Sequence, residues 1–233
     1  MMHLLVSRFA CGTKDFITKE WVDYRLDLLE KYCYPSIVNQ TNKNFKWLVF
    51  STECNINEEQ TERINKLEMM NHILLKKGYG YVHAVQDEAK KIKDTTDILV
   101  TSRVDCDDAL GKHFIENIQN NINKKEDTFV LNFPKGIEYN LKTKNLTYRN
   151  HKDSNMFTTM IEKNGAATIV CEQHQRLIKK FKVYQINENE YNWLQIIHEK
   201  NIFTKNNLGK GKVTLNNEEI KNLFGCNLTA SHI

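Results

Sequence analysis

The chain has 233 residues, of which 40% are hydrophobic and 27% charged, with only 9 Gly and 2 Pro. This composition excludes a disordered or collagen-like protein and fits a compact folded domain. The net charge of +4 comes from 33 basic and 29 acidic residues that are spread along the sequence, which argues against nucleic acid as the partner. No apolar run reaches the roughly 18 residues that span a membrane, and the N-terminus lacks a signal-peptide pattern, so we expect a cytoplasmic protein with no transmembrane segment.

The first half of the chain alternates strand and helix patterns. Short apolar runs predict strands at 3–9, 45–50, 72–77 and 97–105, and amphipathic stretches predict helices at 18–35, 57–70, 81–93 and about 109–123. Thr18 and Asn57 suit helix N-caps, and Pro35 interrupts the first helix. Four strand–helix repeats predict a mostly parallel sheet covered by helices on both faces.

The second half, after Thr128, has a different pattern. We expect a strand at 128–134, a hairpin at 136–150, short strands at 155–162 and 167–172, an apolar segment at 191–201, and a last helix at 215–225 that Gly225 stops. No repeat or linker separates the halves, so we expect one α/β domain over 1–233. It would comprise a nucleotide-binding half (1–125), a half with mixed or antiparallel elements (126–204) and a C-terminal tail with a short helix (205–233).

Polar residues follow several predicted strands, at the edge where open α/β sheets bind ligands. The most distinctive set is Asp105, Asp107 and Asp108, which crowd the end of the strand at 97–105. Carboxylates this close raise each other's pKa unless a cation lies among them, and oxygen-rich sites suit Mg²⁺ or Mn²⁺. One of the three could instead cap the next helix.

These features resemble the GT-A class of nucleotide-sugar-dependent glycosyltransferases, and several blocks are similar to those of the rhamnosyltransferase family. The blocks are WVDYR at 21–25, YCYPSI at 32–37 with QT at 40–41, FKWL at 45–48, SRVDCDDA at 102–109 and WLQIIH at 193–198. Together they spread over residues 3 to about 201, most of the chain. One departure is Cys106, which stands where a polar residue, often Asn, is expected.

The resemblance implies a GT-A-like domain that binds a nucleoside-diphosphate sugar, UDP- or dTDP-linked, and a glycan acceptor. It implies that Asp105 contacts the donor and that Asp107 and Asp108 hold Mn²⁺ or Mg²⁺. His198 would complete the metal shell, although a lone His after an apolar run is also often a core residue. The ion would offset the negative charge that builds on the leaving diphosphate.

Four more residues follow the predicted strands and are candidates for donor binding: Arg8, Ser51, Glu53 and Arg103. The two arginines could donate paired hydrogen bonds to phosphate or nucleobase oxygens. Arg25 lies on a predicted helix, where it could equally pair with a neighbouring acid.

The second half offers candidates for the acceptor side. An inverting transferase needs a carboxylate base, whereas a retaining one does not need it in the same place. The acids available are Asp153, Glu162, Glu172, Glu188 and Glu190. We favour Glu190 as the catalytic residue because it lies just before Trp193. His174 and Trp193 could line the acceptor pocket, although core packing explains Trp193 equally well.

The sequence therefore favours a metal-dependent glycosyltransferase that moves a sugar, rhamnose by the family's name, from a nucleoside diphosphate to a glycan hydroxyl. A Mg²⁺-dependent phosphoesterase is the first alternative, but it predicts a second acidic cluster that the sequence does not show. The other alternative is a non-catalytic nucleotide- or glycan-binding module, which predicts binding without turnover.

Overall fold

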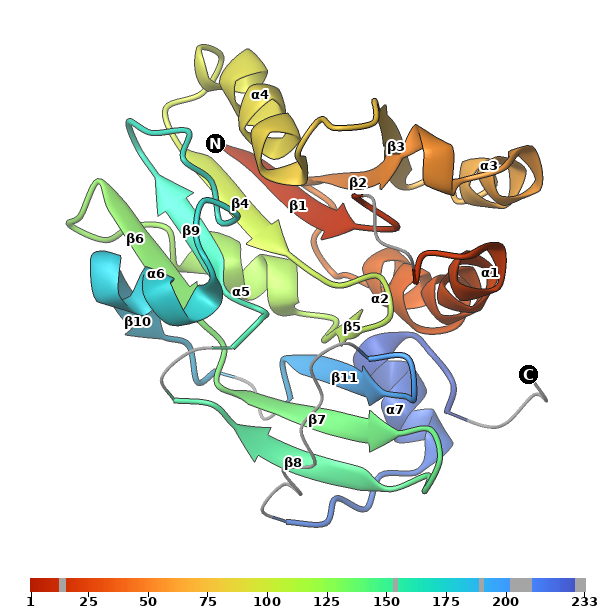
Figure 1. Ribbon diagram of the computed structural model, residues 1–233. Helices are drawn as coiled ribbons and strands as arrows, with labels where there is room; N and C mark the ends of the chain where they lie inside the picture. The colour runs from red at the N-terminus through yellow and green to blue at the C-terminus, as the bar shows by residue number, and fades with distance from the viewer. Residues whose placement is uncertain (13–15, 153–154, 189–190, 202–210, 229–233) are drawn as a thin grey trace.

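The computed structural model describes residues 1–12, 16–152, 155–188, 191–201 and 211–228. Their strands form a seven-stranded main sheet, in the order β10-β6-β9-β4-β1-β2-β3, and a four-stranded small sheet, in the order β5-β11-β7-β8. Figure 1 shows the small sheet below the main one, with the last helix behind β11. None of the helices among the described residues is both long and apolar enough to cross a membrane.

The parallel part of the main sheet is confirmed. It consists of β1 (Met2–Arg8), β2 (Lys46–Thr52), β3 (Met70–Leu75) and β4 (Leu99–Arg103). Strand β1 lies between β2 and β4, and β3 pairs with β2, all in parallel. The carboxyl ends of these strands therefore meet at one edge of the sheet, as the strand–helix repeats predict.

The helices that connect these strands begin where the sequence predicts, but two differ in length. They are α1 (Lys19–Leu28), α3 (Glu58–Asn65) and α4 (Tyr81–Lys93). The Thr18 hydroxyl caps α1, and Asn57 forms a capping box with Gln60 at the start of α3. Helix α3 ends at Asn65, earlier than the predicted 70, because Met70 already belongs to β3. Pro35 does not stop the first helix. The chain passes through a π-helical turn at Leu29–Cys33 into α2 (Tyr34–Val38), where Pro35 lies in the first turn and its missing N–H costs little.

The second half of the chain completes the main sheet. Strand β9 (Thr159–Glu162) pairs antiparallel with both β4 and β6 (Thr128–Asn132), and β10 (Lys182–Gln185) pairs parallel with β6. The two predicted halves thus share one sheet, and the domain is a single α/β unit.

The small sheet contains the predicted hairpin and one strand that the sequence analysis missed. The hairpin is β7 (Lys135–Asn140) and β8 (Leu146–Asn150), and β11 (Trp193–Ile197) joins it in parallel.

The helix predicted from residue 109 is wrong at its start. Residues Ala109–Leu110 form β5, which pairs antiparallel with β11, and α5 spans only Phe114–Asn120. Both β5 side chains are fully buried, so packing against β11 overrides their helix propensity.

The strand predicted at 167–172 is also wrong. The Glu162 carboxylate accepts the backbone N–H groups of Ala167 and Thr168, each at 2.9 Å, and this holds the segment in turns. A helix that the sequence analysis missed follows it, α6 (His174–Lys180).

The last helix, α7 (Asn217–Phe224), is confirmed, and Gly225 ends it with φ of 71° in the left-handed region.

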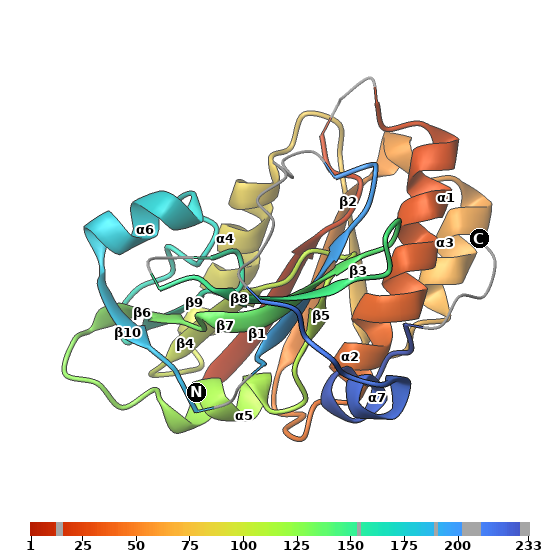
Figure 2. The ribbon, with the colours of Figure 1, turned by 90° about the horizontal axis from the view of Figure 1, so that it is seen from below.

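Helices cover both faces of the main sheet (Figure 2). Side chains of α1, α3 and α5 belong to the hydrophobic cluster on one face, and those of α4 and α6 belong to the cluster on the other. A third cluster lies between the small sheet, α7 and the end of α1. The small sheet is thereby attached to the main one, near the edge where the parallel strands end.

The contact between Gly136 and Trp193 gives a test of this attachment. A Cβ on Gly136 would overlap the Trp193 indole, which is fixed by stacking on Phe157 with ring centroids 4.8 Å apart. We expect Gly136→Ala to lower the free energy of unfolding by roughly 1–3 kcal/mol, as overpacking does, measured by urea denaturation. Gly80→Ala is the matched control, because its Cβ would meet no atom closer than 3.5 Å. Equal stabilities of the two variants would contradict the packing described here.

Candidate active site

The acidic segment, Asp105 to Asp108, follows β4 and leads into β5 at the edge where the parallel strands end. Two buried apolar residues anchor it: Val104, whose N–H donates to the Val6 carbonyl at 3.2 Å, and Cys106, which is fully buried in the core. Cys106 is therefore a packing residue. Because it points into the core, Asp105 on the other side of the backbone is exposed.

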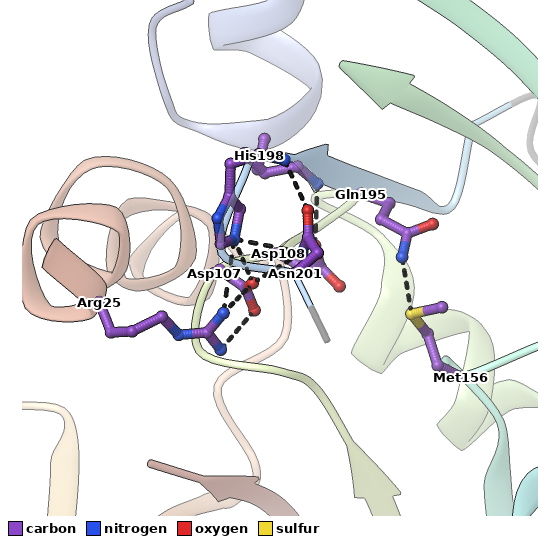
Figure 3. Close-up of polar contacts among 8 residues, drawn as sticks. Arg25, Asp107, Asp108, Met156, Gln195, His198 and Asn201 are labelled. Atoms are coloured by element: carbon purple, nitrogen blue, oxygen red, sulfur yellow. Dashed lines mark hydrogen bonds and ion pairs between the residues drawn. The ribbon is translucent and has the colours of Figure 1, made fainter. Parts of the chain in front are cut away.

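Asp108 serves as a structural link. It is only 3% exposed, and its Oδ1 accepts the backbone N–H of Ile196 in β11 at 2.8 Å (Figure 3). Burial, together with the charges of Asp107 and Asp105, raises its pKa well above the usual range. This carboxyl therefore ties the acidic segment to the small sheet.

Asp107 lies at the centre of a buried polar network. The Arg25 guanidinium donates hydrogen bonds to both carboxylate oxygens of Asp107, from Nη2 to Oδ1 at 2.9 Å and from Nη1 to Oδ2 (Figure 3). His198 Nε2 lies 2.9 Å from Oδ2, and Asn201 Nδ2 lies 3.5 Å from it. Burial would raise the pKa of Asp107, but the Arg25 charge and the His198 hydrogen bond outweigh it and hold the pKa below its usual value.

Helix α1 places Arg25 in this network. Its guanidinium lies 5.4 Å from the centroid of the Trp21 ring, one helical turn earlier, and the Arg25 side chain is 13% exposed. The neighbouring Tyr24 ring packs edge-on against His198 at 5.4 Å. The acid that Arg25 pairs with is thus 82 positions away in the chain, which helix spacing alone does not indicate.

Asn201 is a member of this network that the sequence analysis missed. Its Oδ1 accepts the backbone N–H of His198 at 2.5 Å, and its Nδ2 lies 3.2 Å from His198 Nε2. The amide therefore fixes the turn that follows β11 and the histidine within it. No sequence motif marks an Asn three residues after a His, so only the tertiary structure identifies it.

The predicted metal ligands do not fit a divalent ion in this arrangement. Among the residues that the structure describes, no three His, Cys, Asp or Glu side chains are grouped closely enough to hold one. Asp107 Oδ2 already contacts three side chains, Arg25, His198 and Asn201, and Oδ1 accepts from Arg25. Donation from His198 Nε2 to Asp107 uses the nitrogen that faces the site, and His198 Nδ1 is buried without a partner.

Three of the predicted donor-binding residues come together at the carboxyl ends of β1 and β4. Arg8 and Asp105 are exposed, and Arg103 is half-buried with its Nε donating to the Met156 carbonyl at 2.8 Å. Burial lowers the pKa of Arg103, Asp105 opposes this shift and Arg8 adds to it, so the three charges lie within electrostatic range. The N-terminus of α4, which begins at Tyr81, is part of the same edge, because Tyr81 packs on Phe50 of β2 with ring centroids 5.5 Å apart.

Two other predicted donor residues lie apart from these charges. Ser51 is fully buried within β2, where its hydroxyl pairs with His72 Nε2 at 2.9 Å. Its role is therefore to join β2 to β3. Glu53 is exposed in the short 3₁₀ turn Glu53–Asn55 that follows β2.

Of the two predicted acceptor residues, one is buried in the core and the other is half-buried near Arg103. Trp193 is 1% exposed, stacks on Phe157 and donates from Nε1 to the Phe133 carbonyl at 2.8 Å, so it is a core residue. His174, at the start of α6, is half-buried. Burial, together with the charges of Arg103 and His151, lowers its pKa to about 4. It therefore lies near Arg103 as a neutral imidazole.

The candidate base Glu190 lies outside the described residues, as does Asp153. The remaining three acids are engaged elsewhere. Glu162 holds the turn after β9, Glu172 pairs with Lys180, and Glu188 accepts from Asn121 Nδ2 at 3.0 Å. None of these three contacts the network around Asp107.

The network predicts that substitutions of Asp107 and Asp105 change the free energy of unfolding by very different amounts. Asp107→Asn leaves the buried Arg25 charge without its partner and should lower the free energy of unfolding by about 3 kcal/mol or more, whereas the exposed Asp105→Asn should change it by less than about 0.5 kcal/mol. Chemical denaturation at pH 7 measures both. The advantage of the wild type over Asp107→Asn should shrink as the pH falls below about 4, the unfolded pKa of Asp, because the folded pKa is lower. Similar stabilities for the two variants at pH 7 would refute the structural role of Asp107.

The chain matches solved structures only distantly. S. aureus TarS 1-349 in complex with UDP-GlcNAc is 12% identical, with a TM-score of 0.47 over 86% of this chain and 60% of that one. The mannosyltransferase PcManGT from Pyrobaculum calidifontis in complex with GDP-Man and Mn²⁺ is 8% identical, with a TM-score of 0.48 over 85% of this chain and 57% of that one. The chain thus spans about 60% of the length of these two proteins. No curated protein matches the sequence.

The family comparison covers most of the sequence. The family described as "Putative rhamnosyl transferase" matches residues 10–209, a range that includes Arg25, the acidic segment and His198. The chain therefore belongs to this family of rhamnosyl transferases.

Proposed function

We propose that this chain is a glycosyltransferase that binds a nucleoside-diphosphate sugar at the carboxyl ends of β1 and β4 and transfers the sugar to a glycan hydroxyl. The observation that carries the proposal is the grouping of Arg8, Arg103 and Asp105 at that edge, in a chain whose family is that of rhamnosyl transferases. Rhamnose as the sugar and UDP or dTDP as the nucleotide belong to the same proposal.

The charges at this edge suit a diphosphate. Two guanidinium groups provide forked N–H donors that match phosphate oxygens, and the N-terminus of α4 adds a favourable dipole. The exposed carboxylate of Asp105 suits the hydroxyl groups of a ribose, because an ionised carboxylate can only accept hydrogen bonds. Donor binding therefore needs no rearrangement of the buried network around Asp107.

The reaction that follows from this placement is a group transfer. The acceptor hydroxyl oxygen forms a bond to the anomeric carbon, the bond from that carbon to the diphosphate oxygen breaks, and the nucleoside diphosphate leaves with the electron pair. Arg8 and Arg103 stabilise the charge that develops on the leaving oxygen. We propose Glu190 as the base that takes the hydroxyl proton in an inverting reaction, and His174 as a contact for the acceptor, since it lies near Arg103.

The residues that the family resemblance implies for Mn²⁺ or Mg²⁺ have other partners as they are arranged: Asp107 pairs with Arg25 and His198, and Asp108 Oδ1 accepts the Ile196 N–H. The transfer outlined above depends only on the residues of the chain. A bound divalent ion would supply positive charge for the leaving diphosphate.

Nucleotide affinity tests the donor site directly. One of UDP, dTDP and GDP should raise the melting temperature of the wild type, because a ligand that binds only the folded state stabilises it. We expect Arg8→Gln and Arg103→Gln each to weaken that nucleotide at least tenfold in calorimetric titrations, as loss of a charge-assisted contact does. Lys46→Gln is the control, since Lys46 is exposed at the opposite end of β2 and should bind like the wild type. Unchanged affinity in both arginine variants would place the donor elsewhere.

The reaction products distinguish a glycosyltransferase from a phosphoesterase and from a non-catalytic binding module. Incubation with the matching nucleotide sugar and a panel of glycans should release the nucleoside diphosphate and yield a glycan that is heavier by one sugar. Release of inorganic phosphate without transfer would identify a phosphoesterase. Nucleotide binding with no product at all would identify a binding module.

A further inference from the structure

The cation beside Asp107 in this structure is a side chain of the protein. The Arg25 guanidinium makes two parallel hydrogen bonds to the carboxylate, the fork geometry that is the strongest pairing of these groups. Its Nη1 also lies 3.4 Å from His198 Nε2, so the guanidinium lies beside the point where Asp107 and His198 contact each other at 2.9 Å.

A divalent ion could not join this arrangement without displacing the guanidinium. Mg²⁺ requires ligand oxygens at about 2.1 Å in near-octahedral geometry, whereas Asp107 Oδ2 already contacts Arg25, His198 and Asn201, and Oδ1 accepts from the Arg25 guanidinium. A doubly charged ion placed there would also be repelled by the Arg25 charge within a few ångströms, in surroundings that screen the charge poorly.

The guanidinium is held firmly in this position. Only 13% of the Arg25 side chain and 5% of the Asp107 side chain are exposed, and the Trp21 ring lies under the guanidinium at 5.4 Å. Swinging Arg25 away would leave a buried carboxylate unpaired until an ion arrived, which is costly.

We propose, on the basis of the function proposed above, that this chain binds its nucleoside-diphosphate donor without a divalent ion at Asp107, because Arg25 fills the cation position beside that carboxylate. Asp107 and Arg25 then neutralise each other, and Asp108 is engaged with Ile196. The charge that faces the diphosphate comes from Arg8 and Arg103. Arg25 is a positioning residue, which keeps the acidic segment in place for the donor while preventing metal entry.

Binding of Mn²⁺, followed by the electron paramagnetic resonance signal of the free ion, tests the inference without any nucleotide or activity. We expect that no Mn²⁺ binding by the wild type depends on Asp107, so the wild type and Asp107→Asn should bind the same amount of the ion. Arg25→Ala should gain one Mn²⁺ per chain, and the double variant Arg25→Ala/Asp107→Asn should lose it again. Arg63→Ala is the matched control, because Arg63 also pairs with two acids, Asp27 and Glu30, but on the outer side of α1 and α3. Mn²⁺ binding by the wild type that depends on Asp107 would overturn the inference.

Folding of Arg25→Ala is checked by circular dichroism. If this variant does not fold, Arg25→Gln replaces it, because the glutamine amide can still donate a hydrogen bond to Asp107 but carries no charge, and it should admit Mn²⁺ where the wild type does not. A folded variant that gains no Mn²⁺ would overturn the assignment of the cation position to Arg25.

Nucleotide affinity separates this inference from the proposed function. UDP, dTDP and GDP are titrated into the wild type once with EDTA and once with excess Mn²⁺. We expect the dissociation constant of the nucleotide that binds to agree within about twofold between the two conditions. Tenfold weaker binding in EDTA would overturn the inference and leave the glycosyltransferase intact. Absence of binding in both conditions would count against the proposed function, and the Mn²⁺ titration would still decide the inference.

Discussion

The architecture of the site depends on one buried ion pair, between Arg25 of α1 and Asp107 of the acidic segment. Removing two charges from water is unfavourable, and only excellent geometry and further hydrogen bonds compensate for it. Both conditions hold here: the pair is bidentate, Trp21 lies under the guanidinium, and His198 and Asn201 contact the same carboxylate oxygen. Since these residues come from α1, the acidic segment and the turn after β11, the pair fixes three distant parts of the chain at one point.

The acidic segment shows how burial gives three neighbouring carboxylates different roles. Asp108 is buried against the backbone of β11 and links the two sheets, Asp107 is buried against a guanidinium, and Asp105 is exposed beside Arg8 and Arg103. The environment also moves the pKa values of the two buried acids in opposite directions. Only Asp105 is thus free to contact a ligand, although the sequence presents all three acids alike.

The small sheet matters because it brings the end of β11 to the main sheet. Strand β5 is only two residues long, yet it pairs with β11 directly after the acidic segment. The Asp108 link lies next to this pairing, and His198 follows β11 immediately. The carboxyl edge of the parallel strands, where we propose that the donor binds, and the turn after β11 therefore lie at the same end of the main sheet.

Local patterns in the sequence determined the parallel strands, the start of α4 at Tyr81, the Thr18 and Asn57 caps, the hairpin and the last helix, because hydrophobic periodicity and capping act over a few residues. The motif blocks also indicated the family, and the ends of the predicted parallel strands directed attention to Asp105, Arg8 and Arg103, because residues that follow parallel strands meet at one edge. Only the tertiary structure decided that Ala109 and Leu110 form a strand, that residues 167–172 form a loop with turns and bends, and that Ser51 and Trp193 belong to the core. It also decided that the partner of Asp107 is Arg25, because pairing and burial across 82 residues depend on how the whole chain packs.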